Sequence, residues 1–182
     1  GIAPDGRTLA VPCGRSGSGV QLWDVATRAV RGVLPVPCAQ AYFSPQSRWI
    51  AAVVAGGGRV DVFNAQTAEL AGSIPRFLQL NDVAFSPDES LLETTSDEWT
   101  NGSQVVLQLW RWRDKTLLAE RRFPSFRDSF HYKVAFHPDG RRLAIGEHQG
   151  GVRLLNLTNL ADVQSLAAHQ PGVTGLGISR DG

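Results

Sequence analysis

The sequence predicts an all-β fold built from four similar units, each with four antiparallel strands. A turn motif recurs at intervals of about 40 residues, which marks architectures made of stacked repeats. Between the turns lie short runs of Val, Leu and Ile, punctuated by 19 Gly and 10 Pro, and this pattern is typical of strands joined by tight turns. The periodicity of helices is hard to find along the chain.

The turn motif reads Ala3-Pro4-Asp5-Gly6 where it first occurs. Pro at its second position fixes φ at about −65°, and Asp or Gly beside it suits a tight reversal. Each copy is therefore expected to join two antiparallel strands. Further copies occupy residues 44–47, 86–89, 137–140 and 179–182.

Each unit is predicted to hold a strand before the turn, a strand after it, a Gly-rich connection and two further strands. The strands after the turns are small or aliphatic, as expected for strands covered on both faces. Three of the four third strands alternate apolar with polar residues, which is the pattern of a half-buried strand. The first strands are expected at 39–44, 81–86, 132–137 and 173–179, the second at 7–13, 48–54, 90–96 and 141–147, the third at 20–23, 60–63, 107–110 and 152–155, and the fourth near 29–34, 69–74, 115–123 and 162–168.

One four-stranded unit cannot bury both of its faces, so the units are expected to stack, and radial stacking gives a β-propeller. Residues 1–182 are interpreted as one propeller segment. The chain has no Met, and it is expected to begin at a second strand and to end with a first strand. We therefore expect an excerpt of a longer protein that contributes four blades to a larger ring.

The turns, together with the sequence Val20-Gln21-Leu22-Trp23-Asp24, resemble the WD repeat (WD40) over essentially the whole chain. Only the first unit keeps the Trp-Asp pair. In this family a buried Asp before the third strand and a His near the first strand share a hydrogen-bond network; His169 matches the His, but no turn supplies the Asp. The positions that carry the resemblance are Trp23, Asp24, Phe63, Trp110, Asp139, Gly140 and His169.

The resemblance implies a non-catalytic scaffold on whose rim other proteins or peptides dock. The repeats are similar to those of large bacterial WD-repeat proteins, so the segment is expected to serve as the sensing or docking part of a regulatory protein such as a serine/threonine kinase. The alternative is a propeller enzyme, lactonase-like or otherwise hydrolytic, or an accessory domain of a hydrolase. An enzyme would need acids or histidines converging on the central channel from the first strands, which offer Asp82, Lys133 and little else.

The third unit is longer than the others by about ten residues, and the extra length is expected in loops over 96–103 and 121–130. Loops on a rigid scaffold are where recognition residues collect. Asp97, Glu98, Trp99 and Arg127 are the predicted partner-binding residues. Trp99 could instead fold back over the edge of its blade.

The charge balance argues against nucleic acid and membrane partners. Lys and Arg number 18 against 17 Asp and Glu, so no global field would attract a polyanion. The only basic and aromatic cluster, residues 110–122, could meet phosphates, but alternation along a strand suits an outer strand with Trp110 and Trp112 buried. No cofactor is expected.

The remaining reactive side chains do not predict a catalytic or metal site. The four histidines form no spaced ligand set, and no nucleophile motif occurs. Cys13 and Cys38 are expected as buried thiols, with a disulfide as the alternative. Two cysteines are too few for a disulfide scaffold, which favours a reducing compartment and a cytoplasmic location.

Overall fold

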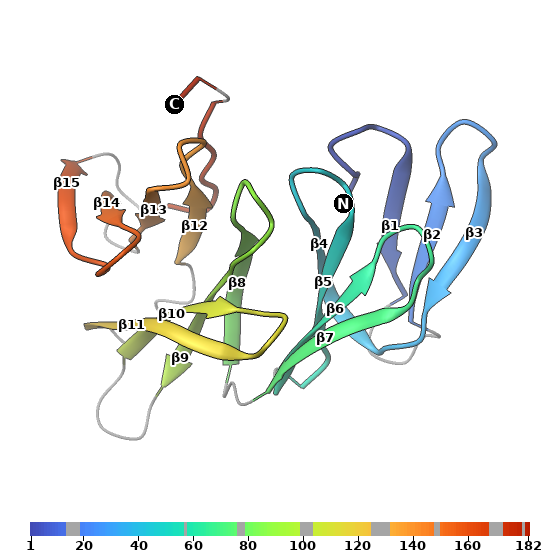
Figure 1. Ribbon diagram of the computed structural model, residues 1–182, viewed down its shortest axis with the longest axis horizontal. Coiled ribbons are helices and arrows are strands. Elements are labelled where there is room, and N and C mark those ends of the chain that lie inside the picture. The colour runs from blue at the N-terminus through green and yellow to red at the C-terminus, as the bar shows by residue number, and fades with distance from the viewer. Residues whose placement is uncertain are drawn as a thin grey trace. The chain divides into compact units, whose positions relative to one another are not determined.

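The computed structural model describes residues 1–13, 19–56, 58–75, 79–98, 104–124, 132–147, 150–167, 173–179 and 181–182. Within these ranges every regular element is a strand, and there are fifteen of them. The strands form four antiparallel sheets, and each sheet is a meander of strands that follow one another in the sequence (Figure 1). The all-β prediction is confirmed.

The first sheet has three strands and the other three sheets have four each. The first contains β1 (Thr8–Pro12), β2 (Val20–Asp24) and β3 (Ala29–Leu34); the second contains β4 (Cys38–Phe43), β5 (Trp49–Val54), β6 (Arg59–Asn64) and β7 (Leu70–Pro75). The third contains β8 (Gln79–Phe85), β9 (Leu92–Glu98), β10 (Gln104–Arg111) and β11 (Thr116–Pro124); the fourth contains β12 (Lys133–Phe136), β13 (Arg142–Gly146), β14 (Gly151–Asn156) and β15 (Asp162–Ala167).

Both ends of the chain differ from the expectation. Ile2 forms an isolated bridge with Leu9, and Ala10 donates its N–H to the carbonyl of Gly1 at 2.8 Å. The first three residues therefore pair with β1, so the chain starts before the second strand and not at it. Residues 173–179 are not a strand; the N–H of Val173 reaches the carbonyl of Glu147 at 3.2 Å, just beyond the end of β13.

The turns repeat their geometry as well as their sequence. In the first type, which joins the first and second strands of a unit, the serine hydroxyls of Ser44 and Ser86 accept the N–H of Trp49 at 3.0 Å and of Leu91 at 2.9 Å. The fourth residue of this turn has positive φ, whether it is Gly140 or a residue with a side chain. The non-glycine residues with positive φ are Ser47 and Glu89 in these turns and Arg28, Ala68, Lys115 and Leu160 in the turns that join the third and fourth strands.

The chain divides into two compact units. The first unit comprises Gly1–Phe77 with Trp112–Lys115, and the second comprises Leu78–Arg111 with Thr116–Gly182. Each has its own apolar cluster: the first is formed by Ala10, Val20, Leu22, Leu34, Val36, Cys38, Ile50, Ala52, Phe63 and Ala65. The second is formed by Val105, Leu107, Phe123, Tyr132, Val134, Leu143, Ile145, Leu155 and Leu160.

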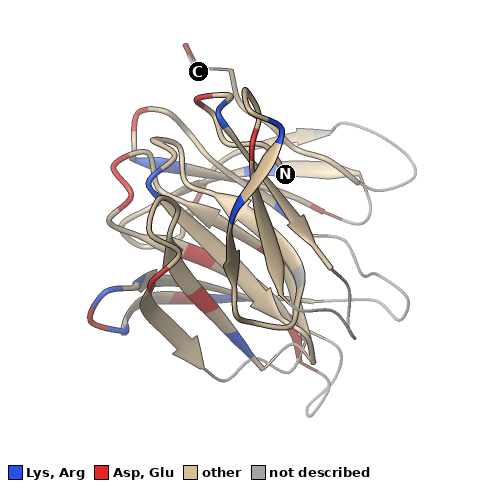
Figure 2. Cartoon of the chain, turned by 90° about the vertical axis from the view of Figure 1, so that its right-hand side faces the viewer, with Lys and Arg blue, Asp and Glu red and all other residues tan. Residues whose placement is uncertain are grey.

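Charged residues of both signs are interspersed on the side of the molecule that Figure 2 presents, and several of them lie in turns. Neither sign gathers there into a field that would attract a polyanion or a polycation, in agreement with the formal net charge of +1.

Candidate functional site

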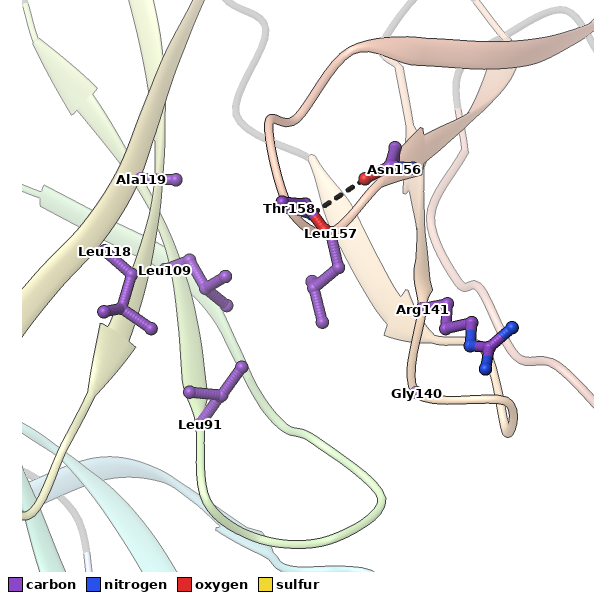
Figure 3. A pocket seen from close by; sticks show the side chains of 9 residues that line it. All are labelled: Leu91, Leu109, Leu118, Ala119, Gly140, Arg141, Asn156, Leu157 and Thr158. Carbon is purple, nitrogen blue, oxygen red and sulfur yellow. Dashed lines mark hydrogen bonds between the residues drawn. The ribbon is translucent and has the colours of Figure 1, made fainter.

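An open cavity of about 490 Å³ lies in the second unit, between the third and fourth sheets (Figure 3). One wall comes from the third sheet and is entirely aliphatic. The other wall comes from two turns of the fourth sheet and carries one cation. The lining residues are Leu91, Leu109, Leu118 and Ala119 on the first wall and Gly140, Arg141, Asn156, Leu157 and Thr158 on the second.

The aliphatic wall follows from the register of three neighbouring strands. Leu109 of β10 lies opposite Ala119 of β11, so their side chains share one face of the sheet. Leu91, at the end of the turn before β9, completes the wall and is held by its hydrogen bond to Ser86. Leu118 of β11 is 42% exposed, so part of this wall is open to a partner.

The opposite wall is built by two turns that are bonded to each other. The N–H of Leu157 reaches the carbonyl of Arg141 at 2.9 Å, and the Asn156 side chain accepts the N–H of Thr158 at 2.8 Å (Figure 3). Asp139 accepts the backbone N–H of Arg141 at 2.8 Å, and this hydrogen bond is the main reason that the pKa of Asp139 falls to about 2. These contacts fix the Leu157 side chain so that it points into the cavity.

The lining of the groove is therefore mostly apolar, as suits an apolar group. Its five aliphatic side chains would exclude water from a bound ligand, and Arg141 supplies a positive charge at the rim. Figure 3 shows the guanidinium extending away from the leucines. Among the described residues no ion pair engages that guanidinium, although its neighbour Arg142 is paired with Asp139 at 2.9 Å.

The structure corrects the expected position of Asp97 and Glu98. Both lie in β9 and not in a loop, because β9 stays paired with β10 as far as Glu98 opposite Gln104. Asp97 is only 2% exposed, and burial raises the pKa of its carboxyl, which the Asn81 side chain partly offsets. Glu98 is half-buried and forms an ion pair with Arg122. Asp97 thus has no accessible surface to offer, whereas Glu98 does.

Trp99 and Arg127, which were predicted to bind a partner with them, lie outside the described residues, and so does the repeat position His169. The other repeat positions are described. Phe63 is 3% exposed in the core of the first unit, and the indole N–H groups of Trp23 and Trp110 donate to Gln21 at 3.1 Å and to Thr94 at 3.2 Å.

Asp24 stabilises the turn that follows β2, a role that the sequence analysis did not predict. Its carboxylate accepts the backbone N–H of Thr27 at 2.7 Å, and this hydrogen bond lowers the pKa of Asp24. Asn64 and Asn156, which replace this Asp in other units, also accept backbone N–H groups of their turns through Oδ1. The replacement of Asp by Asn therefore keeps the turn, because either oxygen is an acceptor.

The basic cluster is largely occupied by internal contacts. Arg121 forms a bidentate pair with Asp162 at 2.8 and 2.9 Å. Arg122 pairs with Glu98 and with Glu120. Trp112 is 1% exposed, as the buried alternative expected, but it lies in the turn after β10 and not on the strand.

In the described part of the first strands, the acid and the base, Asp82 of β8 and Lys133 of β12, are paired with each other. The ammonium group of Lys133 lies 3.6 Å from the carboxylate of Asp82, which also accepts the N–H of Val134 at 3.2 Å. Among the residues that the structure describes, no three His, Cys, Asp or Glu side chains come together as a metal-ion site.

Cys13 and Cys38 are both free thiols. Cys38 is buried, and burial raises the pKa of its thiol to about 11, so it is a poor nucleophile. Within the described residues, no helix has the length and apolarity that a membrane span requires.

The chain is similar to the β-propeller domain of Cps50 (Swd1) from Myceliophteria thermophila, with a TM-score of 0.73 and 16% sequence identity. The match covers 100% of this chain and 58% of that chain, so the chain spans little more than half of the structure it matches. No protein-family model matches the sequence, and no curated protein does. The likeness in structure confirms the predicted β-propeller fold.

Proposed function

We propose that residues 1–182 form a WD-repeat propeller segment that binds other proteins and does not catalyse a reaction. The observation that carries this proposal is the open groove of the second unit, with five aliphatic side chains and one rim cation. Concave sites with apolar walls and few polar groups are the usual binding sites of a folded domain. The fold supplies the rigid frame but does not by itself determine the function.

The pairing of Asp82 with Lys133 supports the non-catalytic proposal, because the residues that an enzyme would use are engaged with each other. A bacterial-type regulatory protein, such as a serine/threonine kinase that carries this segment as its docking part, remains our proposal for the longer protein. The two free thiols agree with the proposed cytoplasmic location.

Glu98 remains a proposed contact at the edge of the third sheet, together with Trp99 and Arg127. Asp97 is withdrawn from this set because its carboxylate is enclosed by the sheet. Glu98 and the groove residue Leu91 lie at opposite ends of β9, so a partner could engage either alone.

The test is site-specific photocrosslinking in cells of the source organism, with the photoreactive residue at Leu118 or at Val30. The two positions are a matched pair, since both lie in the last strand of a sheet and are 42% and 43% exposed. We expect one defined protein to crosslink at Leu118 only. The purified partner should then bind the wild-type chain and the Val30→Asp variant, but not Leu118→Asp. Equal crosslinking at both positions, or binding that survives Leu118→Asp, would refute docking at the groove.

A further inference from the structure

The internal repeat indicates what the groove accepts, because all four repeats have the same turn between the third and fourth strands. In each repeat the turn starts with the residue directly after the third strand, three residues before a residue with positive φ. The residues at this knob position are Val25, Ala65, Trp112 and Leu157.

In the first compact unit, which includes Trp112–Lys115, the space that corresponds to the groove is filled by a side chain. Trp112 is 1% exposed and packs edge-on against Trp49, with the ring centroids 5.2 Å apart. It also covers Gly72, where an added Cβ would meet the indole at 3.2 Å. Arg113 lies over the Trp112 ring at 4.3 Å, within the range of a cation–π interaction.

A second closed version uses Ala65. This small knob is 3% exposed and belongs to the apolar cluster of the first unit, and Arg31 of β3 donates to the Ala65 carbonyl at 2.5 Å. A small side chain at the knob position is thus compatible with a closed space.

The second unit has the same frame around Leu157. Leu91 corresponds to Trp49, since each donates its N–H to the serine of its turn. Ala119 corresponds to Gly72. Ala119 pairs with Leu109 and Gly72 pairs with Val62, and in both sheets a β-bulge follows directly after that pair. Leu157 is smaller than an indole, and the cavity of about 490 Å³ remains beside it.

We propose that this groove binds an aromatic side chain, best a tryptophan, from a segment of a partner protein that carries an acidic residue beside it. The aromatic side chain takes the place that Trp112 fills in the first unit. The acidic residue meets Arg141, whose guanidinium extends away from the leucines at the edge of the groove and is not paired with any described acidic residue. This inference rests on the proposed function and names the chemistry of the partner at the same site.

The energetics favour a single anchor. Tryptophan buries a large apolar area with little loss of conformational entropy, which is why it is enriched among the side chains that dominate binding. Aliphatic walls give it a dry environment, and a charge at the rim adds selectivity with little affinity.

The experiment measures binding of a defined peptide to the whole chain with 13C-methyl-labelled leucines. The probe is acetyl-Gly-Glu-Trp-Glu-Gly-amide, compared with the same peptide carrying Ala for Trp or Lys for Glu. We expect saturable shifts of the Leu91, Leu109, Leu118 and Leu157 methyl groups with the first peptide. Affinity should fall at least about 30-fold with Ala, the loss of an anchor side chain, and a few-fold with Lys.

Two matched variants place the binding at the groove. Leu157→Trp supplies the indole from within and should abolish binding, whereas Val25→Trp, at the same turn position but 43% exposed, should leave it unchanged. Arg141→Glu should reverse the preference for Glu over Lys. If Leu157→Trp does not fold, Leu118→Asp makes the same test, since that side chain is already partly exposed.

Absence of leucine shifts with the Trp peptide, or equal binding of the Ala peptide, would overturn the inference. A crosslinked partner that docks at Leu118 without an aromatic residue would refute only the tryptophan anchor and would leave the proposed docking function intact. The docking function itself would be refuted by equal crosslinking at Leu118 and Val30.

Discussion

β5 and β9 occupy the same place in two sheets, yet they bury opposite chemistry. β5 reads Trp-Ile-Ala-Ala-Val-Val, and its four central residues are buried. β9 reads Leu-Glu-Thr-Thr-Ser-Asp-Glu, and its first six residues are buried. The same backbone position therefore tolerates an apolar strand in the first unit and a polar strand in the second, but at different cost.

Because β9 is polar, most of the buried side-chain N and O atoms without a hydrogen-bond partner lie in the second unit, within the described residues. Both carboxylate oxygens of Glu93 are buried without a hydrogen-bond partner in the described part of the chain, and so is the hydroxyl of Thr95. Buried polar groups without partners reduce stability. The unit that carries the groove thus holds more unpaired buried polar atoms than the first unit among the described residues.

The largest effect is expected from Trp112→Ala. The change removes the indole between Trp49 and Gly72 and should cost about 3 to 5 kcal/mol, as for other buried Trp residues. Hydrogen exchange of the β5 and β7 amides should accelerate strongly, while that of the β13 amides changes little. Trp23→Ala, at a half-buried tryptophan, is the control and should have a much smaller effect. Equal acceleration in both units would remove the distinction between them.

Glu93→Gln tests the polar strand directly. Burial, aided by the negative charge of Asp82, raises the pKa of Glu93 well above its usual value, so the folded state keeps a proton that the unfolded state loses. The wild-type free energy of unfolding should therefore fall as pH rises from about 4.5, by about 1.4 kcal/mol per pH unit, until the raised pKa is reached.

Glu93→Gln, which cannot ionise, should lack this decline and be more stable than the wild type at pH 8. Urea unfolding between pH 5 and 9 measures the difference, and Glu69→Gln on the surface is the matched control. A parallel pH profile for the wild type and Glu93→Gln would show that Glu93 is ionised in the folded state.

Arg121→Ala should have a smaller effect on the second unit. The guanidinium bridges β11 to the fourth sheet through Asp162 and through the Leu160 carbonyl at 2.6 Å. Because the pair is partly exposed, the loss should be about 1 kcal/mol and should shrink at high salt. Thermal unfolding at low and high ionic strength measures it, with the exposed Arg7→Ala as the control. A loss that does not depend on salt would assign the effect to packing.

The smallest perturbation is thiol labelling, which leaves the sequence unchanged. Cys13 should react with iodoacetamide at neutral pH, while Cys38 should be protected because it is buried and its pKa is about 11. Mass spectrometry of the labelled chain distinguishes the two positions. Rapid labelling of Cys38 would mean that the apolar cluster of the first unit opens easily.

Much of the fold could be predicted from local signals. The repeated turn motif at residues 3–6, 44–47, 86–89 and 137–140 marks the turns before the second strands, and alternation indicates the faces of the third strands. In the third repeat the sequence predicts a second strand that ends at Ser96, because Asp97 and Glu98 are typical loop residues. Pairing with β10 carries the strand further, and that tertiary effect has no local signal.

The groove could not be predicted, because it depends on the difference in size between two residues at corresponding turn positions. The aligned repeats match Trp112 with Leu157, but only the packing shows that Trp112 fills its space while a cavity remains beside Leu157. The sequence pattern predicts an outer strand with Trp110 and Trp112 buried, but Trp110 is half-buried on the inner strand β10 and Trp112 is buried from the turn that follows it. Alternation reports the faces of a strand and not where the strand ends. It does not report which arginines find acidic partners on another sheet.

The left-handed turn residues make the scaffold open to engineering. An L-residue at positive φ costs about 1 to 2 kcal/mol, whereas glycine loses only about 0.5 to 1 kcal/mol through its greater freedom in the unfolded chain. Arg28 is such a residue; it is exposed and lies away from the groove. Glycine at this position would raise the melting temperature slightly, which gives a tolerant background on which weakly folded variants of the groove can be studied.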